Sequence, residues 1–177
     1  YYIRNPWAKQ LIATNNNITI NGVNDPLSSA KPQRAAITMS ETSLTPVKYT
    51  ASGNQIDISN AQFGIYSGVL NSATIKFNII DIKDSGTGIN IQSNFRTSVS
   101  CNDIKSNYVS GIAKNSVGIS TGNFSLRTSI YCNEVDSTFR GFFFGGVNAN
   151  TLFKGNDIRH HFNGLYLNNQ AVIGQQP

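Results

Sequence analysis

The stretch SIYCNEVDSTFRGFFF, residues 129–144, contains the two-part pattern that decides the fold. The pattern consists of Asn133-Glu134-Val135 and, eight residues after the Asn, Gly141-Phe142. Five repeats are marked by an Asn and a following Gly: Asn54, Asn78, Asn102, Asn133 and Asn156, with Gly64, Gly88, Gly118, Gly141 and Gly164. Successive Asn residues lie 24, 24, 31 and 23 residues apart. A period of roughly 20 to 50 residues predicts a solenoid of stacked units.

Aligning the repeats on the Asn shows which positions face the core, because side chains alternate along a strand. The position three residues before the Asn is apolar throughout: Ala51, Ile75, Val99, Ile130 and Phe153. The position two residues after it is apolar too: Ile56, Ile80, Ile104, Val135 and Ile158. Both positions indicate an inward-facing strand anchored by the Asn.

A second inward-facing strand is predicted after the Gly. It carries Ile65, Ile89, Ile119, Phe142 and Leu165 at one position, and Ser67, Ile91, Thr121, Phe144 and Leu167 two residues later. A third short strand is expected through Leu70, Phe95 and Leu126. Three strands and three corners per coil predict an all-β fold, a right-handed parallel β-helix with about five regular coils plus one or two irregular N-terminal coils.

The first fifty residues fit the period poorly. Residues 17–20 and 36–39 read as strands on either side of a loop at residues 25–32. We expect residues 1–50 to form irregular coils that continue into the regular coils of residues 51–177 as one domain, a piece of a longer protein. The long interval places seven extra residues between Asn102 and Gly118, so residues 106–117 are expected to form a longer loop.

Turn chemistry explains the repeated Asn and Gly without a ligand. Stacked Asn side chains can bond to one another, and Asn tolerates left-handed bends at corners. Gly is expected to form the other corner.

The composition argues against nucleic-acid binding and membrane insertion. The chain has 177 residues, of which 39% are hydrophobic, 13% are charged and 23 are Asn, and its net charge is +5. Lys and Arg form no run, which gives poor support for nucleic-acid binding. No apolar run approaches the ~20 residues of a membrane span, so no membrane insertion is expected.

The repeat resembles the right-handed parallel β-helix proteins, which include the pectin-lyase-like and NosD-like groups. The resemblance covers about residues 51–174 and rests on segments such as Ser129 to Val135 followed by Gly141 to Phe144. The Cys-Asn strand starts and the segment from Gly164 to Gly174 look more narrowly like large secreted surface proteins of the type IX system. That resemblance implies an extracellular or cell-surface location and the secretion machinery as a partner.

Carboxylates on adjacent coils are the candidate catalytic group. Asp103, Glu134 and Asp157 each follow an Asn, and two residues further on stand Asp81, Lys105, Asp136 and Arg159. All seven are expected to face outward on one sheet, where a ~4.8 Å strand spacing allows acid–base work or calcium binding. Calcium is the one cofactor they suggest. Stacked ion pairs are the alternative, because the second column alternates in sign. The Asp-Asp pair and Gly-His-Gly pattern of the family's polygalacturonases are absent.

Candidate ligand-binding residues lie elsewhere. Arg96 and Arg127 occupy equivalent positions and could together hold a carboxylate or sulfate. Phe143 and Tyr166 are expected to stack on the outer face near Arg140, as in a sugar-binding groove or a protein contact. The pair His160 and His161 follows Arg159 at a corner, either as a proton-transfer site or as solvated side chains; of the two, His160 is the ligand-binding candidate.

Cys101 and Cys132 precede successive Asn residues, and we expect both side chains to face inward on neighbouring coils. A disulfide and a pair of free thiols are both compatible with that placement.

These patterns favour a structural or adhesive module of a large secreted or cell-surface protein that contacts polysaccharide. The alternative is a polysaccharide lyase or glycoside hydrolase that acts on an acidic polysaccharide through Asp103, Glu134 and Asp157 with Arg159. An ice- or crystal-binding face is a third reading, for which only Thr97, Thr128 and Thr151 share a position.

Overall fold

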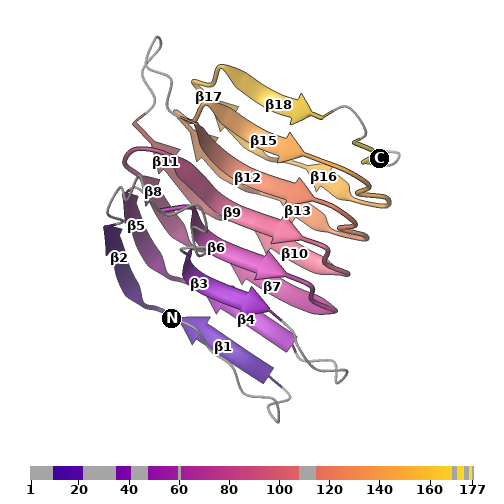
Figure 1. Ribbon diagram of the computed structural model, residues 1–177, viewed down its shortest axis with the longest axis horizontal. Coiled ribbons are helices and arrows are strands. Elements are labelled where there is room, and N and C mark those ends of the chain that lie inside the picture. The colour runs from indigo at the N-terminus through magenta and orange to yellow at the C-terminus, as the bar shows by residue number, and fades with distance from the viewer. Residues whose placement is uncertain are drawn as a thin grey trace, which may run out of the picture.

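The computed structural model describes residues 10–21, 35–40, 48–59, 61–107, 115–168, 171–173 and 176. Within these ranges the chain forms eighteen strands and no helix. Each strand pairs in parallel with the strand three positions later in the chain. This pairing gives three six-stranded sheets that wind up one axis (Figure 1). The predicted right-handed parallel β-helix is confirmed, with about six coils.

The first sheet contains β1 (Gln10–Thr14), β4 (Lys48–Ser52), β7 (Ser72–Lys76), β10 (Thr97–Ser100), β13 (Ser129–Tyr131) and β16 (Leu152–Lys154). The second sheet contains β2 (Asn17–Asn21), β5 (Gln55–Ser59), β8 (Ile79–Ile82), β11 (Asp103–Ser106), β14 (Glu134–Asp136) and β17 (Asp157–Arg159). The third sheet contains β3 (Ala35–Ser40), β6 (Phe63–Gly68), β9 (Gly86–Gln92), β12 (Ser116–Gly122), β15 (Arg140–Phe144) and β18 (Asn163–Leu167).

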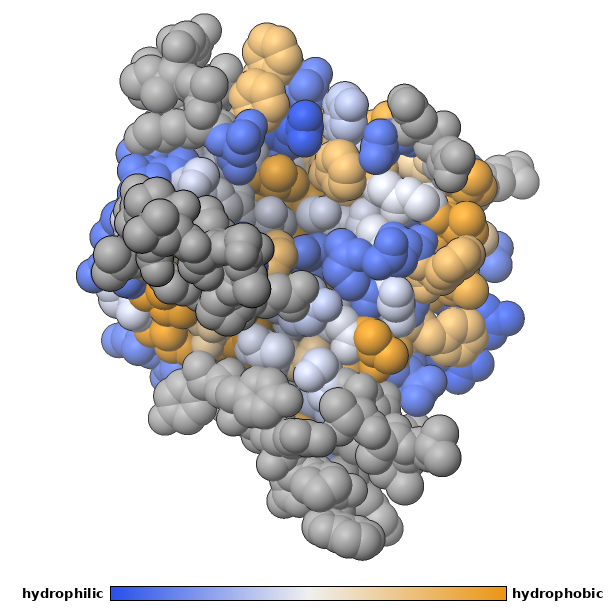
Figure 2. All heavy atoms as spheres, in the orientation of Figure 1, coloured by the Kyte–Doolittle hydropathy of each residue, from blue (hydrophilic) through white to orange (hydrophobic). Residues whose placement is uncertain are grey.

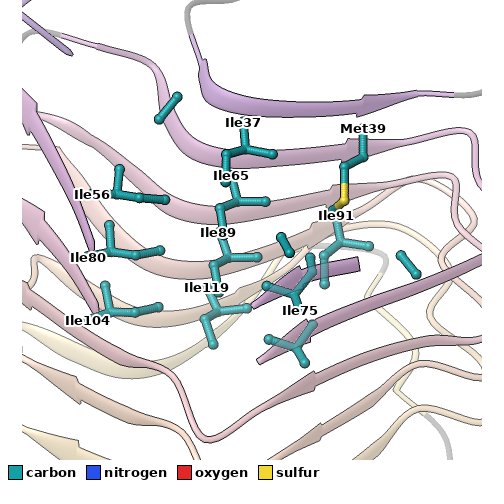
Figure 3. Packing of buried hydrophobic residues seen from close by; sticks show 14 of the residues in the cluster. Ile37, Met39, Ile56, Ile65, Ile75, Ile80, Ile89, Ile91, Ile104 and Ile119 are labelled. Carbon is teal, nitrogen blue, oxygen red and sulfur yellow. The ribbon is translucent and has the colours of Figure 1, made fainter. Parts of the chain in front are cut away.

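The core consists of aligned apolar columns, one from each sheet. Figure 3 shows Ile56, Ile80 and Ile104 of the second sheet stacked beside the third-sheet column that contains Ile89 and Ile119. Each of these five side chains is at most 1% exposed. The inward positions predicted from the sequence are therefore confirmed over the middle coils. Burial of such branched side chains, worth roughly 1.5–3 kcal/mol each, is the main force that stacks one coil on the next.

The last described coil has an uncovered inner face. Leu165 and Leu167 align with the buried Phe142 and Phe144 of β15, yet they are 44% and 48% exposed. No later strand among the described residues packs over β18, and the core column is therefore open there.

The anchoring Asn residues lie at corners and not within strands. Each Asn stands between a strand of the first sheet and one of the second, so the apolar positions before and after it belong to different sheets. The left-handed bend falls on the preceding residue, as at Phe77 (φ 56°) and Cys132 (φ 57°). The expected role of Asn in that bend was therefore wrong. The predicted ladder of Asn side chains is present: Asn54 Nδ2 donates to Asn78 Oδ1 over 2.8 Å, and the next steps repeat this bond.

The repeated Gly residues also differ from expectation, because they lie inside the third sheet with no left-handed φ. Gly118 shows why Gly is needed there. A Cβ on Gly118 would lie 2.2 Å from Val135 Cγ1 and 2.6 Å from the carbonyl oxygen of Gly141. The missing side chain at Gly118 lets the third sheet approach the second, so this Gly provides room and does not form a corner.

The predicted third strand begins later than expected. Phe95 and Leu126 form only an isolated bridge, and the strands start two or three residues further on, at Thr97 and Ser129.

The register of the N-terminal coil, which the sequence left open, follows from the pairing of Ile18 with Ile56. This alignment makes Asn16 the first member of the Asn ladder, with Nδ2 donating to Asn54 Oδ1 over 2.8 Å. The predicted strands at residues 17–20 and 36–39 fall within β2 and β3. The loop predicted at residues 25–32 lies outside the described residues, as do residues 108–114 of the predicted loop after Ser106.

Candidate functional site

The second sheet brings the predicted carboxylates together on its outer side. Asp103 pairs with Glu134, and Glu134 pairs with Asp157, so the three carboxylates stand on successive coils. The neighbouring column, Asp81, Lys105, Asp136 and Arg159, is aligned in the same way. Inward-facing residues such as Ile104 and Val135 alternate with these positions, which directs the charged side chains to solvent.

Cations of the adjacent column neutralise these carboxylates. Lys105 Nζ lies 3.2 Å from Asp103 Oδ2, and Arg159 contacts both Glu134, at 3.3 Å, and Asp157. The Asp103 carboxylate raises the pKa of Lys105, and Asp157 and Glu134 raise the pKa of Arg159. The arrangement is the stack of ion pairs that the alternating signs predicted. The other carboxylate oxygen of Asp103, Oδ1, is buried and accepts no hydrogen bond from any described residue.

The two His residues have different environments. His160 is exposed, and its Nδ1 lies 2.7 Å from Asp136 Oδ1. His161 is half-buried and tied to the coil below: its Nε2 lies 2.9 Å from the carbonyl oxygen of Val135, and its Nδ1 lies 2.9 Å from Thr138 Oγ1. His161 therefore joins the last two coils, and it is not the solvated side chain that the sequence left as one reading.

Arg96 and Arg127 come together as predicted. The isolated bridge between Phe95 and Leu126 aligns the two Arg residues on neighbouring coils. Both guanidinium groups lie over the ring of Phe95, with Cζ 5.1 Å and 5.3 Å from its centroid. Both residues have left-handed φ angles and exposed side chains. They form a cationic pair fixed by one ring.

The aromatic residues of the last two coils form a cluster around Arg140. Phe143 stacks on Tyr166 with centroids 5.6 Å apart, and Phe139 stacks on Phe162 at 5.1 Å. Arg140 Cζ lies between the two stacks, 4.5 Å from the Tyr166 centroid, 5.6 Å from that of Phe143 and 5.4 Å from that of Phe139. We call these five residues the aromatic cluster.

The guanidinium group of Arg140 has no anionic partner among the described residues. Its Nε is buried and lacks a hydrogen-bond acceptor there. Phe162, at one side of the aromatic cluster, is 67% exposed. The sequence identified Arg140, Phe143 and Tyr166 but missed Phe139 and Phe162. Their matched positions, one residue before Arg140 and one before Asn163, were the available signal.

The face that contains the third sheet is mixed in polarity. Figure 2 shows a hydrophilic patch in its middle and hydrophobic residues along its right-hand edge, where the third-sheet arrowheads of Figure 1 end. Exposed apolar residues at that corner include Val69 and Phe124, at 64% and 68%.

The cysteines face outward, contrary to prediction. Cys101 is half-buried and Cys132 is exposed, and both are free thiols at left-handed corner positions. The inward positions are taken by the following residues, Asn102 and Asn133. A hydrogen bond with the Cys132 thiol, together with partial burial, raises the pKa of Cys101.

The Thr residues considered for an ice- or crystal-binding face point inward. Thr97, Thr128 and Thr151 are at most 2% exposed, so they cannot form an outward ice-binding ladder.

The described residues contain neither a candidate metal site nor a candidate membrane-spanning helix. Among the described residues no group of three or more His, Cys, Asp or Glu is placed to hold a metal ion. The same residues contain no helix long and apolar enough to cross a membrane. No protein-family model, curated protein or solved structure matches the chain.

Proposed function

We propose that the chain is a structural or adhesive module of a secreted or cell-surface protein and that it holds glycans at the aromatic cluster. The observation that carries the proposal is Arg140, whose guanidinium group lies 4.5 Å from the Tyr166 ring centroid and forms no ion pair with a described residue. The exposed ring of Phe162 offers an apolar surface to the C–H face of a sugar, and Arg140 offers donors to its hydroxyl oxygens.

The scaffold supports this assignment. A parallel β-helix presents side chains at fixed spacing along rigid strands, which keeps the cost of ordering a binding site low. Gly145 leaves room for the Phe143 ring, since a Cβ there would lie 3.0 Å from Phe143 Cε1.

Binding to a panel of neutral and acidic polysaccharides tests the proposal. Tyr166→Ala removes one stacking ring and should weaken binding about tenfold. Tyr66→Ala is the matched control, because Tyr66 lies in the same outward column of the third sheet as Tyr166, four coils away, through Asn90, Ser120 and Phe143. Equal losses in both variants, or binding that Tyr166→Ala leaves unchanged, would contradict the assignment.

The rival proposal is a polysaccharide lyase or glycoside hydrolase that uses Asp103, Glu134 and Asp157 with Arg159. The alignment of the three carboxylates on successive coils is the observation in its favour. The ion pairs speak against it, because each carboxylate already has a cationic partner. Depolymerisation of the same panel, with and without calcium, separates the two. Shorter products that disappear in Glu134→Gln, with the fold retained, would replace the binding module by the enzyme.

A further inference from the structure

The described acidic residues are confined to one side of the solenoid. Every acidic residue that the structure describes lies on the second sheet or within two residues of the end of β8. The outer side of the first sheet has none of them. It carries instead five cations on its strands or within two residues before them: Lys48, Lys76, Arg96, Arg127 and Lys154.

The strand register sorts these cations into two columns. Lys48 pairs with Ser72, and the next two coils carry Arg96 and Arg127 at the corresponding position, immediately before the strand β10 and two residues before β13. The second column runs from Lys76 through Ser100 and Tyr131 to Lys154.

A column of hydroxyl groups separates the two cation columns. It consists of Thr50, Thr74, Ser98 and Ser129, which pair in that order. All four are half-exposed, and none hydrogen-bonds through its side chain to a described residue. The inward neighbours Ala51, Ile75, Val99 and Ile130 are fully buried, which confirms that these hydroxyls face outward.

The five cations are available to a ligand. None forms an ion pair with a described residue, whereas Lys83, Lys105 and Arg159 on the second sheet all do. Arg96 and Arg127 rest on the Phe95 ring, and Lys76 Nζ lies 5.4 Å from the centroid of Phe77. Ring contacts leave the N–H donors free to bind an anion.

The spacing fits an extended polymer. Neighbouring coils lie ~4.8 Å apart, and alternate residues along a strand are separated by ~6.6 Å, which puts the cation columns ~13 Å apart with the hydroxyls midway. We propose that the outer side of the first sheet, which we call the basic track, binds a sulfated polysaccharide that runs along the solenoid axis. The basic track shares no residue with the aromatic cluster, so this proposal does not depend on the proposed function.

The chemistry of the basic track favours a sulfated polysaccharide over a nucleic acid. Sulfate oxygens can accept the two parallel N–H bonds that a planar guanidinium group donates, and sulfate stays charged at all ordinary pH values. Sugar hydroxyls can donate hydrogen bonds to Ser and Thr hydroxyls and accept hydrogen bonds from them. Single-stranded nucleic acids need rings on which bases stack. On this side Phe95 is covered by two guanidinium groups. Phe77 and Tyr131, 57% and 37% exposed, come from coils two steps apart and so do not form a continuous row of rings on successive coils.

The test is binding of the full chain to heparin, measured by titration at several salt concentrations. Binding should weaken as salt rises, since exposed charges are screened. The double variant Arg96→Gln/Arg127→Gln should bind about fivefold more weakly, and adding Lys76→Gln/Lys154→Gln should weaken binding about fivefold again, at about two- to threefold per exposed ion pair. The control Lys83→Gln/Lys105→Gln removes the same charge from the second sheet and should leave heparin binding unchanged.

Melting temperatures confirm that each variant is folded. Equal weakening by the control variant would overturn the proposal, because net charge alone would then explain binding. Equal affinity for desulfated heparin or polygalacturonate would overturn the assignment to sulfate. Equal affinity for single-stranded DNA of the same length would replace the polysaccharide by a nucleic acid.

Discussion

The side chain of Asn78 and its backbone amide both donate to Asn102 Oδ1, over 2.9 Å and 3.1 Å. Asn102 in turn donates through Nδ2 to Asn133 Oδ1 and to the carbonyl oxygen of Ile75. Both Asn78 and Asn102 are at most 1% exposed. One corner of the solenoid is thus held by a continuous chain of buried amides.

Asn102→Ala should be strongly destabilising. The substitution leaves two buried donors of Asn78 without an acceptor, at about 1–3 kcal/mol each. We expect a loss of about 3–5 kcal/mol and a fall in melting temperature of about 10 °C, measured by circular dichroism or calorimetry. The control is Asn107→Ala, since Asn107 is exposed and its side chain bonds to no described residue. A stability loss no larger than that of Asn107→Ala would contradict the ladder's role.

Gly118→Ala should destabilise the stack much more than Gly164→Ala. The new Cβ at Gly118 would lie 2.2 Å from Val135 Cγ1, whereas at Gly164 the nearest atom is 3.5 Å away, in ordinary contact. Overpacking of this kind costs about 1–3 kcal/mol, and Gly164→Ala should cost less than about 0.5 kcal/mol. Urea unfolding of both variants checks the difference. If the two midpoints shifted equally, the close approach of the sheets would not be what selects Gly.

Asp136→Asn should have a pH-dependent effect on stability. Partial burial raises the pKa of Asp136, but hydrogen bonds from His160 and Ser137 outweigh burial and hold the pKa below its ordinary value. The carboxylate therefore stabilises the fold fully above the unfolded pKa, near pH 4, and loses that contribution as the pH falls through the folded value. We expect the variant to be about 0.5 kcal/mol less stable at pH 5 and equal to the parent below about pH 3.

A double-mutant cycle with His160→Gln isolates the pair. With the imidazole replaced, Asp136→Asn should change stability at pH 5 by less than it does in the parent chain. Identical effects in both backgrounds would show that the 2.7 Å contact between Asp136 and His160 contributes nothing to folding.

Cys132→Ala should make Cys101 more reactive. The Cys132 thiol raises the pKa of Cys101 through a hydrogen bond and through charge repulsion when ionised. Without Cys132 a larger fraction of Cys101 is thiolate, the nucleophilic form. Alkylation of Cys101 by iodoacetamide at pH 8, followed by mass spectrometry, should become faster. A slower or unchanged rate would mean that the two thiols do not interact.

Part of the aromatic cluster and all of the acidic columns could be predicted from the sequence. A matched position in two repeats predicts stacking on neighbouring coils, and this located Phe143 with Tyr166 and Glu134 with Asp157. The same rule applied to Phe139 and Phe162 would have completed the aromatic cluster. The basic track could have been found in the same way, because Lys48, Arg96 and Arg127 each stand six residues before an anchoring Asn, and Lys76 and Lys154 each stand two residues before one.

The period of the Asn and Gly residues by itself determined the solenoid, its parallel sheets and its core columns, because a repeated unit must stack with its own copy in register. The tertiary structure decided where each coil turns and which residue faces out at the corner. A corner breaks the two-residue alternation of side chains, so parity counted from Asn102 or Asn133 misplaced Cys101 and Cys132. Close packing of the sheets, rather than backbone freedom, explains Gly118, and this depends on Val135, a residue from another sheet.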